Sequence, residues 1–174
     1  MKRRILANLA LVATASAWEA TDAAACGDKF LVVGRGVRSQ RTQGAVRRAS
    51  ILIYNNPSTR MPAAVAEARL ERELTLAGHR LSLVTSPAAV EGELESGRHD
   101  VVLADLSDMA AVEAQVKAAG SRAVLLPVVY NPTDEELAAA EQRYRCVMKA
   151  PSRRHHFLGV LNDALVERSR RRTR

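Results

Sequence analysis

Five short apolar segments alternate with longer amphipathic segments, and this alternation constrains the fold more than any other feature. The apolar segments are rich in Val, Ile and Leu and are bounded by turn residues, so they predict strands. The predicted strands are 50–54, 81–84, 101–105, 123–130 and 146–148, and the predicted helices are 62–77, 87–96, 109–119, 133–145 and 154–168. Strands and helices in strict alternation predict an α/β fold with a parallel sheet, right-handed crossovers and helices on both faces.

The third predicted strand ends in a carboxylate. Val101, Val102 and Leu103 form a continuous apolar run, which is typical of a strand buried on both faces, and Asp105 follows directly. Ligands of open α/β sheets bind beyond the carboxyl ends of the strands, so Asp105 lies where such folds have their functional sites. We assign Asp108 instead to the N-cap of the helix that starts at Met109.

Composition indicates one domain and excludes a nucleic-acid stacking platform. The chain has 174 residues, 47% hydrophobic and only 3% aromatic, so its core is built from aliphatic side chains. Its formal charge of +7 arises at the ends, where eight of the 26 basic residues lie. The other 18 nearly balance the 19 acidic residues, so the domain between the ends is close to neutral.

The first 25 residues have the pattern of a secretory signal peptide. Lys2, Arg3 and Arg4 precede an apolar stretch that is followed by small residues, and cleavage after either Ala17 or Ala25 fits that pattern. Residues 26–48 then form an N-terminal extension with one extra strand at 29–33. We therefore expect an exported protein of the periplasm or cell envelope.

The chain has two cysteines, Cys26 and Cys146. Export implies an oxidising compartment, so we expect them to form a disulfide. Cys26 also follows three alanines in a degenerate lipoprotein pattern, and a lipid there would replace the disulfide and attach the protein to a membrane. We interpret the basic tail, 169–174, as a solvated segment. The alternative is that it contacts an anionic membrane surface.

The histidines do not have the spacing of metal ligands. His155 and His156 are adjacent, so on a helix their side chains diverge by about 100°. His79 and His99 each precede a strand, away from any cluster of cysteines or carboxylates. We predict that His79 and His99 are exposed and that the chain holds no metal.

The predicted domain, 49–168, resembles the receiver domain of two-component response regulators. That resemblance implies a flavodoxin-like three-layer fold with the strand order 2-1-3-4-5. Asp105 matches the phosphoacceptor aspartate at the end of the third strand. Lys149, in Met148-Lys149-Ala150-Pro151, matches the invariant lysine after the fifth strand.

The chain also departs from the receiver pattern. Receivers hold Mg²⁺ with two adjacent acidic residues after the first strand, and here those positions are Asn55 and Asn56. The hydroxyl residue that should end the fourth strand is replaced in the neighbourhood of Tyr130. We therefore interpret the domain as a pseudo-receiver, in which Asp105 and Lys149 form a structural ion pair.

Three functions remain open at this point. The first is an exported, non-catalytic receiver-like module that binds a protein partner and takes no nucleic acid and no small-molecule cofactor. The second is a phosphorelay receiver with Asp105 as the phosphoacceptor. The third is a small-ligand site in the strand-end crevice around Asn55, Asn56, Asp105 and Lys149.

Overall fold

The computed structural model describes residues 48–172 and contains the predicted sheet. All four neighbouring strand pairs are parallel, and the order is β2-β1-β3-β4-β5. The strands are β1 (Ser50–Tyr54), β2 (Arg80–Val84), β3 (Val101–Asp105), β4 (Val124–Tyr130) and β5 (Met148–Ala150). The α/β class, the flavodoxin-like topology and the strand order are thereby confirmed. The signal peptide, the extra strand at 29–33 and Cys26 lie outside the described residues.

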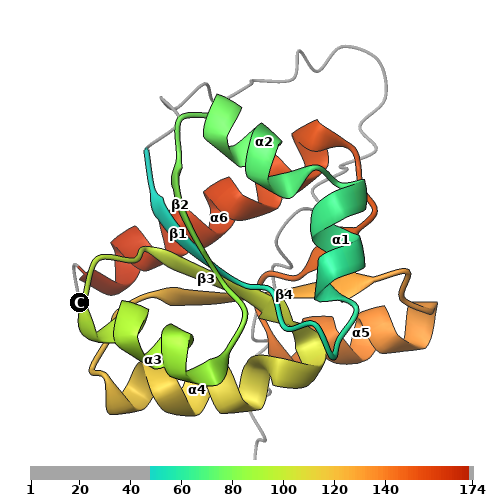
Figure 1. The fold of residues 1–174 in the computed structure, drawn as a ribbon. Coiled ribbons are helices and arrows are strands. Elements are labelled where there is room, and N and C mark those ends of the chain that lie inside the picture. Colours follow the sequence, from blue (N-terminus) through green and yellow to red (C-terminus); the bar gives the residue numbers. More distant parts are fainter. Residues whose placement is uncertain (1–47, 173–174) are drawn as a thin grey trace, which may run out of the picture.

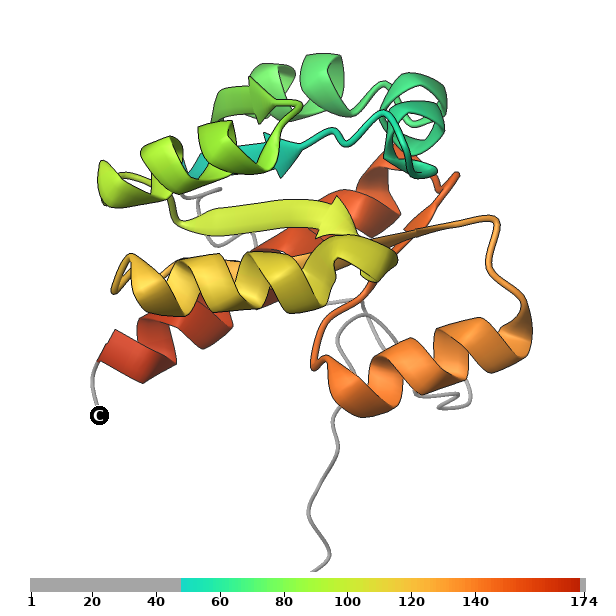
Figure 2. The same ribbon diagram turned by 60° about the horizontal axis from the view of Figure 1, so that its bottom comes forward.

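Six helices and one 3₁₀ turn connect the strands and form two outer layers. They are α1 (Met61–Glu67), α2 (Leu70–Leu76), α3 (Pro87–Glu95), η1 (Leu106–Asp108), α4 (Met109–Ala118), α5 (Asp134–Arg143) and α6 (Arg154–Arg172). Figures 1 and 2 show α6 and α4 on opposite sides of the sheet. The helices thus cover both faces, as the alternation of segments predicts.

Alternate residues of each strand feed two separate cores. Val101 and Leu103 of β3 pack with α1, α2 and α6 in the larger core, whereas Val102 and Ala104 pack with α3 and α4 in the other. All four side chains are fully buried, as the continuous apolar run predicts. Since side chains alternate along a strand, this division tells on which face any residue at a strand end lies.

The segment predicted as one helix, 62–77, is two. Arg69 adopts a left-handed conformation with φ of 49° and separates α1 from α2. The buried residues of α1 include Ala64 and Val65, and an unbroken helix would carry that stripe toward Arg72. The break rotates the next turn so that Leu70 and Leu74 face the core instead, while Ala66 is exposed.

Strand β5 and helix α6 have boundaries that differ from the predicted ones. The strand predicted at 146–148 runs from Met148 to Ala150, so Lys149 lies inside β5 and not after it. Helix α6 continues to Arg172, past the predicted end of the domain at residue 168. Helix α5 begins with a capping box, in which Thr133 and Glu136 accept hydrogen bonds from each other's backbone N–H groups.

The prediction that His79 and His99 are exposed is wrong. Only 6% of His79 and 4% of His99 is exposed, because each side chain is tied to the amino end of β1. The Ala49 N–H donates to His79 Nδ1 at 3.2 Å, and His99 bridges the Ser50 hydroxyl at 3.3 Å and the Glu93 carboxylate at 2.7 Å. The contact of His79 with Ala49 spans 30 residues of sequence, and the contact of His99 with Ser50 spans 49. Local spacing in the sequence therefore gives no indication of either contact.

Candidate functional site

Asp105 lies at the carboxyl end of β3, where the sequence places it. The strand turns there into η1, and Asp105 Oδ1 accepts the Ser107 N–H at 2.9 Å and the Ser107 hydroxyl at 2.7 Å. This pattern is an Asx turn, in which a carboxylate stabilises the chain that follows it. One oxygen of Asp105 is therefore engaged locally, and the side chain remains half-exposed.

Asn55 and Asn56 follow β1 on the neighbouring strand and have different environments. Asn56 Nδ2 donates to both carboxylate oxygens of Asp108, each at 3.1 Å, and Asn56 Oδ1 accepts the Ser58 N–H at 3.0 Å. Asn55 donates its backbone N–H to Val84, while its side-chain Oδ1 is buried without a hydrogen-bond partner. Asn56 thus holds two loops together, and Asn55 keeps an unused acceptor.

Asp108 occupies the N-cap position of α4, as predicted, but its side chain makes no capping hydrogen bond. Both oxygens instead accept from Asn56. The same carboxylate raises the pKa of Tyr54, after burial as the larger cause. Asp108 therefore belongs to the strand-end cluster and not to the cap that the sequence suggests.

Lys149 does not meet Asp105, and the predicted ion pair is wrong. Asp105 is in register with Val128, and Val128 with Met148, so these three residues share the face of α1 and α6. Lys149 follows Met148 by one residue and projects from the opposite face, where it is exposed. The ion pairs recorded within residues 48–172 do not include these two side chains.

The β5 residue that ends on the face of Asp105 is Ala150. It is paired with Tyr130 and is buried in the core shared with α1 and α6. An alanine methyl group carries no charge, so nothing from β5 supplies a cation at this position. The four predicted site residues thus fall into two groups: Asn55, Asn56 and Asp105 share the carboxyl edge near η1, and Lys149 stands apart.

A pocket of about 480 Å³ lies beside Asp105 and contains residues that the sequence did not single out. Arg60 donates to the Tyr130 carbonyl at 3.4 Å, and the Tyr130 hydroxyl donates to Glu67 Oε1 at 2.7 Å. That hydrogen bond raises the pKa of Tyr130. The pocket lining mixes hydroxyl, basic and acidic side chains: Ser58, Thr59, Arg60, Asp105, Ser107, Tyr130 and Glu136.

The donor set does not fit the magnesium ion that the receiver resemblance implies. Among the aspartates at the strand ends, Asp105 bonds through Oδ1 alone, whereas both oxygens of Asp108 accept from Asn56. The unpartnered Asn55 Oδ1 adds a neutral ligand, but a hard divalent cation binds through several oxygen ligands with carboxylate charge among them. Within residues 48–172 no group of three or more His, Cys, Asp or Glu side chains could hold a metal.

Sequence signals for the missed contacts exist but are weak. Asp105 and Ser107 have the Asp-x-Ser spacing of an Asx turn, which local reasoning could have found. The bond between Asn56 and Asp108 spans 52 residues, and the bond between Tyr130 and Glu67 spans 63, so only the folded sheet brings these pairs together.

No helix in the described part of the chain is long and apolar enough to cross a membrane.

Comparison with known proteins supports the fold and leaves the family open. No family model matches the sequence, and no curated protein matches it. Among solved structures, NtrX from Brucella abortus in complex with ADP is similar over 72% of this chain, with 16% identity and a TM-score of 0.58. The match covers 28% of NtrX, so this chain spans less than a third of that protein.

Two isolated receiver domains match over nearly their whole length. The signal receiver domain of a putative Luxo repressor protein from Vibrio parahaemolyticus has 10% identity and a TM-score of 0.55, with 72% of this chain and 96% of that chain covered. A response regulator receiver protein from Sinorhizobium medicae has 18% identity and a TM-score of 0.52, covering 71% and 99%. At these identities the likeness concerns the fold alone, and residues 48–172 have the fold of response-regulator receiver domains.

Proposed function

We propose that this chain is an exported receiver-like module that binds a protein partner in the cell envelope without phosphoryl transfer to Asp105. The observation that carries the proposal is the identity of the β5 residue on the face of Asp105, which is Ala150 and not a lysine. A phosphorylated aspartate adds negative charge at a strand end, and that charge needs a nearby cation or metal ion. Strand β5 supplies no cation at this position, and the donor set does not fit a metal ion.

The neighbouring asparagines support the same proposal. The side-chain amide of Asn56 donates to Asp108, and this bond holds the loop after β1 in place. In a metal-binding receiver the equivalent acidic residues would repel Asp108 unless a cation lay between them. The chain satisfies Asp108 with a neutral donor instead, so this carboxylate needs no ion beside it.

A second candidate function is phosphorylation or small-ligand binding at Asp105. It is favoured by the pocket of about 480 Å³, because Asp105 lines it and is half-exposed. Arg60 is the basic residue in that lining, but its guanidinium donates to the Tyr130 carbonyl. Under this alternative Arg60 would leave Tyr130 and pair with the added anion.

Binding of Mg²⁺ separates the two candidates. We expect the melting temperature of the parent protein to be the same with and without millimolar Mg²⁺, since a ligand that binds only the folded state would raise it. Asn55→Asp supplies the missing carboxylate next to Asp105 and is expected to gain a Mg²⁺-dependent rise. A saturable Mg²⁺-dependent rise in the parent, lost in Asp105→Asn, would favour the phosphorylatable alternative.

Intact-mass spectrometry of protein recovered from its native host tests the exported location. The proposal expects a chain that lacks residues 1–17 or 1–25 and carries no phosphate. Full-length protein in the cytoplasm would contradict export. A lipid mass on Cys26 would show that the exported protein is anchored to a membrane. The same spectrum before and after reduction shows whether a disulfide is present.

A further inference from the structure

The amino half of β4 has a free edge within residues 48–172. Strand β4 has seven residues, but β5 pairs only with Val128, Val129 and Tyr130. On its other side β4 pairs with β3 from Val124 onward, and the Val124 N–H donates to the Asp100 carbonyl. Because alternate residues point their N–H and C=O groups to opposite sides, Leu125 and Pro127 face the free edge.

Pro127 fits this placement, because its missing N–H lies on the side that has no partner strand. Proline is tolerated in a sheet where the absent donor faces an edge. The free edge therefore offers the N–H and C=O of Leu125 and the C=O of Pro127. These three groups match the needs of one short added strand and define where its own N–H and C=O groups must lie.

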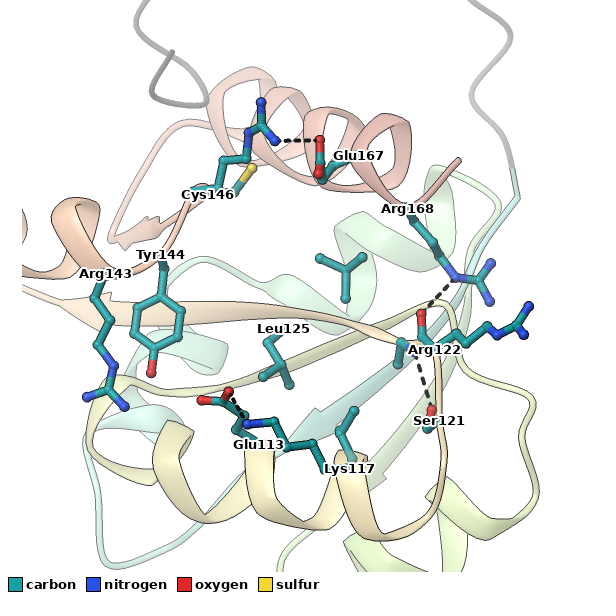
Figure 3. Close-up of a pocket in the computed structure, with 14 residues that line it drawn as sticks. Glu113, Lys117, Ser121, Arg122, Leu125, Arg143, Tyr144, Cys146, Glu167 and Arg168 are labelled. Carbon is teal, nitrogen blue, oxygen red and sulfur yellow. Dashed lines mark hydrogen bonds and ion pairs between the residues drawn. The ribbon is translucent and has the colours of Figure 1, made fainter. Parts of the chain in front are cut away.

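A groove of about 770 Å³ runs along this edge between α4 and α6. Figure 3 shows Leu125 between Glu113 and Lys117 of α4 on one side and Glu167 and Arg168 of α6 on the other. The last residue of α5, Arg143, and the segment that follows it to Cys146 also line the groove. The groove has an apolar floor and charged walls, which suits a strand with apolar side chains.

Cys146 lines the groove and is not a free thiol. The chain has one other cysteine, Cys26, which precedes the apolar segment Lys29-Phe30-Leu31-Val32-Val33 by two residues. A tether at Cys146 would leave the first residue of that segment within about 10 Å of the groove, at about 3.3 Å per extended residue. A tether at Cys146 would thus bring an apolar, strand-forming sequence within reach of the free edge.

The other end of the segment can also reach. Fourteen residues, 34–47, connect it to Arg48, and they span at most about 46 Å when extended. Arg48 precedes β1, which is separated from β4 by β3 alone, and adjacent strands lie about 4.8 Å apart. The connection is therefore several times longer than the width it has to cross.

We propose that residues 29–33 of this chain add to the free edge of β4 as a further strand, held there by a disulfide between Cys26 and Cys146. The bond forms when the two thiols lose two protons and two electrons to a disulfide oxidant of the exported compartment, which is reduced to its dithiol. The added strand covers Leu125 and turns a half-open edge into a paired one, which removes a template for pairing between molecules.

Amide hydrogen exchange at Leu125 tests the proposal in the full chain. We expect the Leu125 N–H to be protected in the oxidised protein and to exchange at least about tenfold faster in Cys146→Ser, because the tether is lost. Leu31→Pro and Val32→Pro form a matched pair, since neighbouring N–H groups of a strand point to opposite sides. One proline should expose Leu125 strongly and the other weakly, according to which N–H faces β4.

Three results would overturn the proposal. The first is fast exchange of the Leu125 N–H in the oxidised full chain, and the second is protection that both proline variants leave intact. The third is protection that disappears on dilution, because that would assign the edge to a second copy of the chain. Helix α3 serves as an internal control, since the exchange of its amides should be equal in all variants.

Discussion

The two ends of the sheet use polar side chains in different ways. At the amino ends of the strands, His79, His99 and Asp100 reach the chain at Ala49 and Ser50 from other elements and hold it in place. At the carboxyl ends, Asp105 bonds to a residue two positions away and is half-exposed. The first set is buried or half-buried and links distant segments, whereas the second is open to solvent on one side.

This difference separates stability from function. The Ser50 N–H donates to Asp100 at 2.8 Å, and Asp100 also pairs with Arg168 of α6, so a single carboxylate joins β1 to the last helix. Removing such a partner leaves a buried donor without an acceptor. At the carboxyl end the contacts of Asn56 with Asp108 and of Tyr130 with Glu67 also link distant segments, but Asp105 itself bonds only locally and faces solvent on one side.

The largest predicted effect is at His99. His99→Ala should lower the free energy of unfolding by about 2–3 kcal/mol, because the Ser50 hydroxyl and the Glu93 carboxylate lose their shared partner at a buried position. The matched variant Asp105→Ala should cost about 0.5–1 kcal/mol, the value of a local turn contact. Chemical denaturation of the two variants gives both numbers, and equal losses would erase the contrast between the two ends.

Asn56→Asp should have the next largest effect. The new carboxylate still accepts the Ser58 N–H but can no longer donate to Asp108, and two like charges then face each other. We expect a loss of about 1–2 kcal/mol at neutral pH. Asn55→Ala is the control, because the buried Oδ1 of Asn55 has no hydrogen-bond partner to lose. If the two variants were equally stable, the bridge from Asn56 would have no structural role.

The dependence of stability on pH should come from the amino end. Burial lowers the pKa of His79 below its ordinary value of 6.5. Below about pH 6.5 the unfolded chain therefore binds more protons than the folded protein, so stability falls as the pH falls toward the lower folded pKa. Above about pH 6.5 this contribution is complete.

His79→Gln isolates that contribution. The glutamine amide oxygen can accept the Ala49 N–H but does not titrate, so we expect a flatter stability profile between about pH 7 and pH 5. Urea unfolding at several pH values measures the slope. A parent and a variant with superimposable profiles would show that His79 is not the group responsible.

The smallest predicted effect is at Lys149. Because this side chain is exposed and lies on the face opposite Asp105, Lys149→Ala should change the stability by less than about 0.5 kcal/mol. A double-mutant cycle with Asp105→Ala should give a coupling energy near zero. Significant coupling would mean that the two side chains meet in solution.

The sequence predicts the sheet well and its strand ends poorly. Alternation of apolar and amphipathic segments is sufficient for the parallel sheet and for the burial of β3, because both depend on patterns over many residues. The strand order is implied by the resemblance to receiver domains. The face of Lys149 depends on one residue of register in a three-residue strand, and a shift of one residue reverses the face. That precision lies beyond a prediction from propensity and spacing.

The buried histidines and the Asn56 bridge could not be predicted for a different reason. Each contact joins residues at least 30 positions apart, so it exists only after the strands have paired. The break at Arg69 was accessible in principle, because the apolar spacing between Val65 and Leu70 does not fit one unbroken helical stripe. The positions of Asn55, Asn56 and Asp105 at one edge follow directly from parallel strands.

The central claim is that this receiver fold does not transfer phosphate to Asp105, and the peptide containing Asp105 tests it most directly. Purified protein is incubated with acetyl phosphate and Mg²⁺, and the phosphate on that peptide is measured by mass spectrometry beside Asp105→Asn. We predict that Asp105 remains unmodified in the parent protein, with the same peptide mass before and after incubation. Stoichiometric, Mg²⁺-dependent phosphate on Asp105 that is absent from the variant would contradict the account.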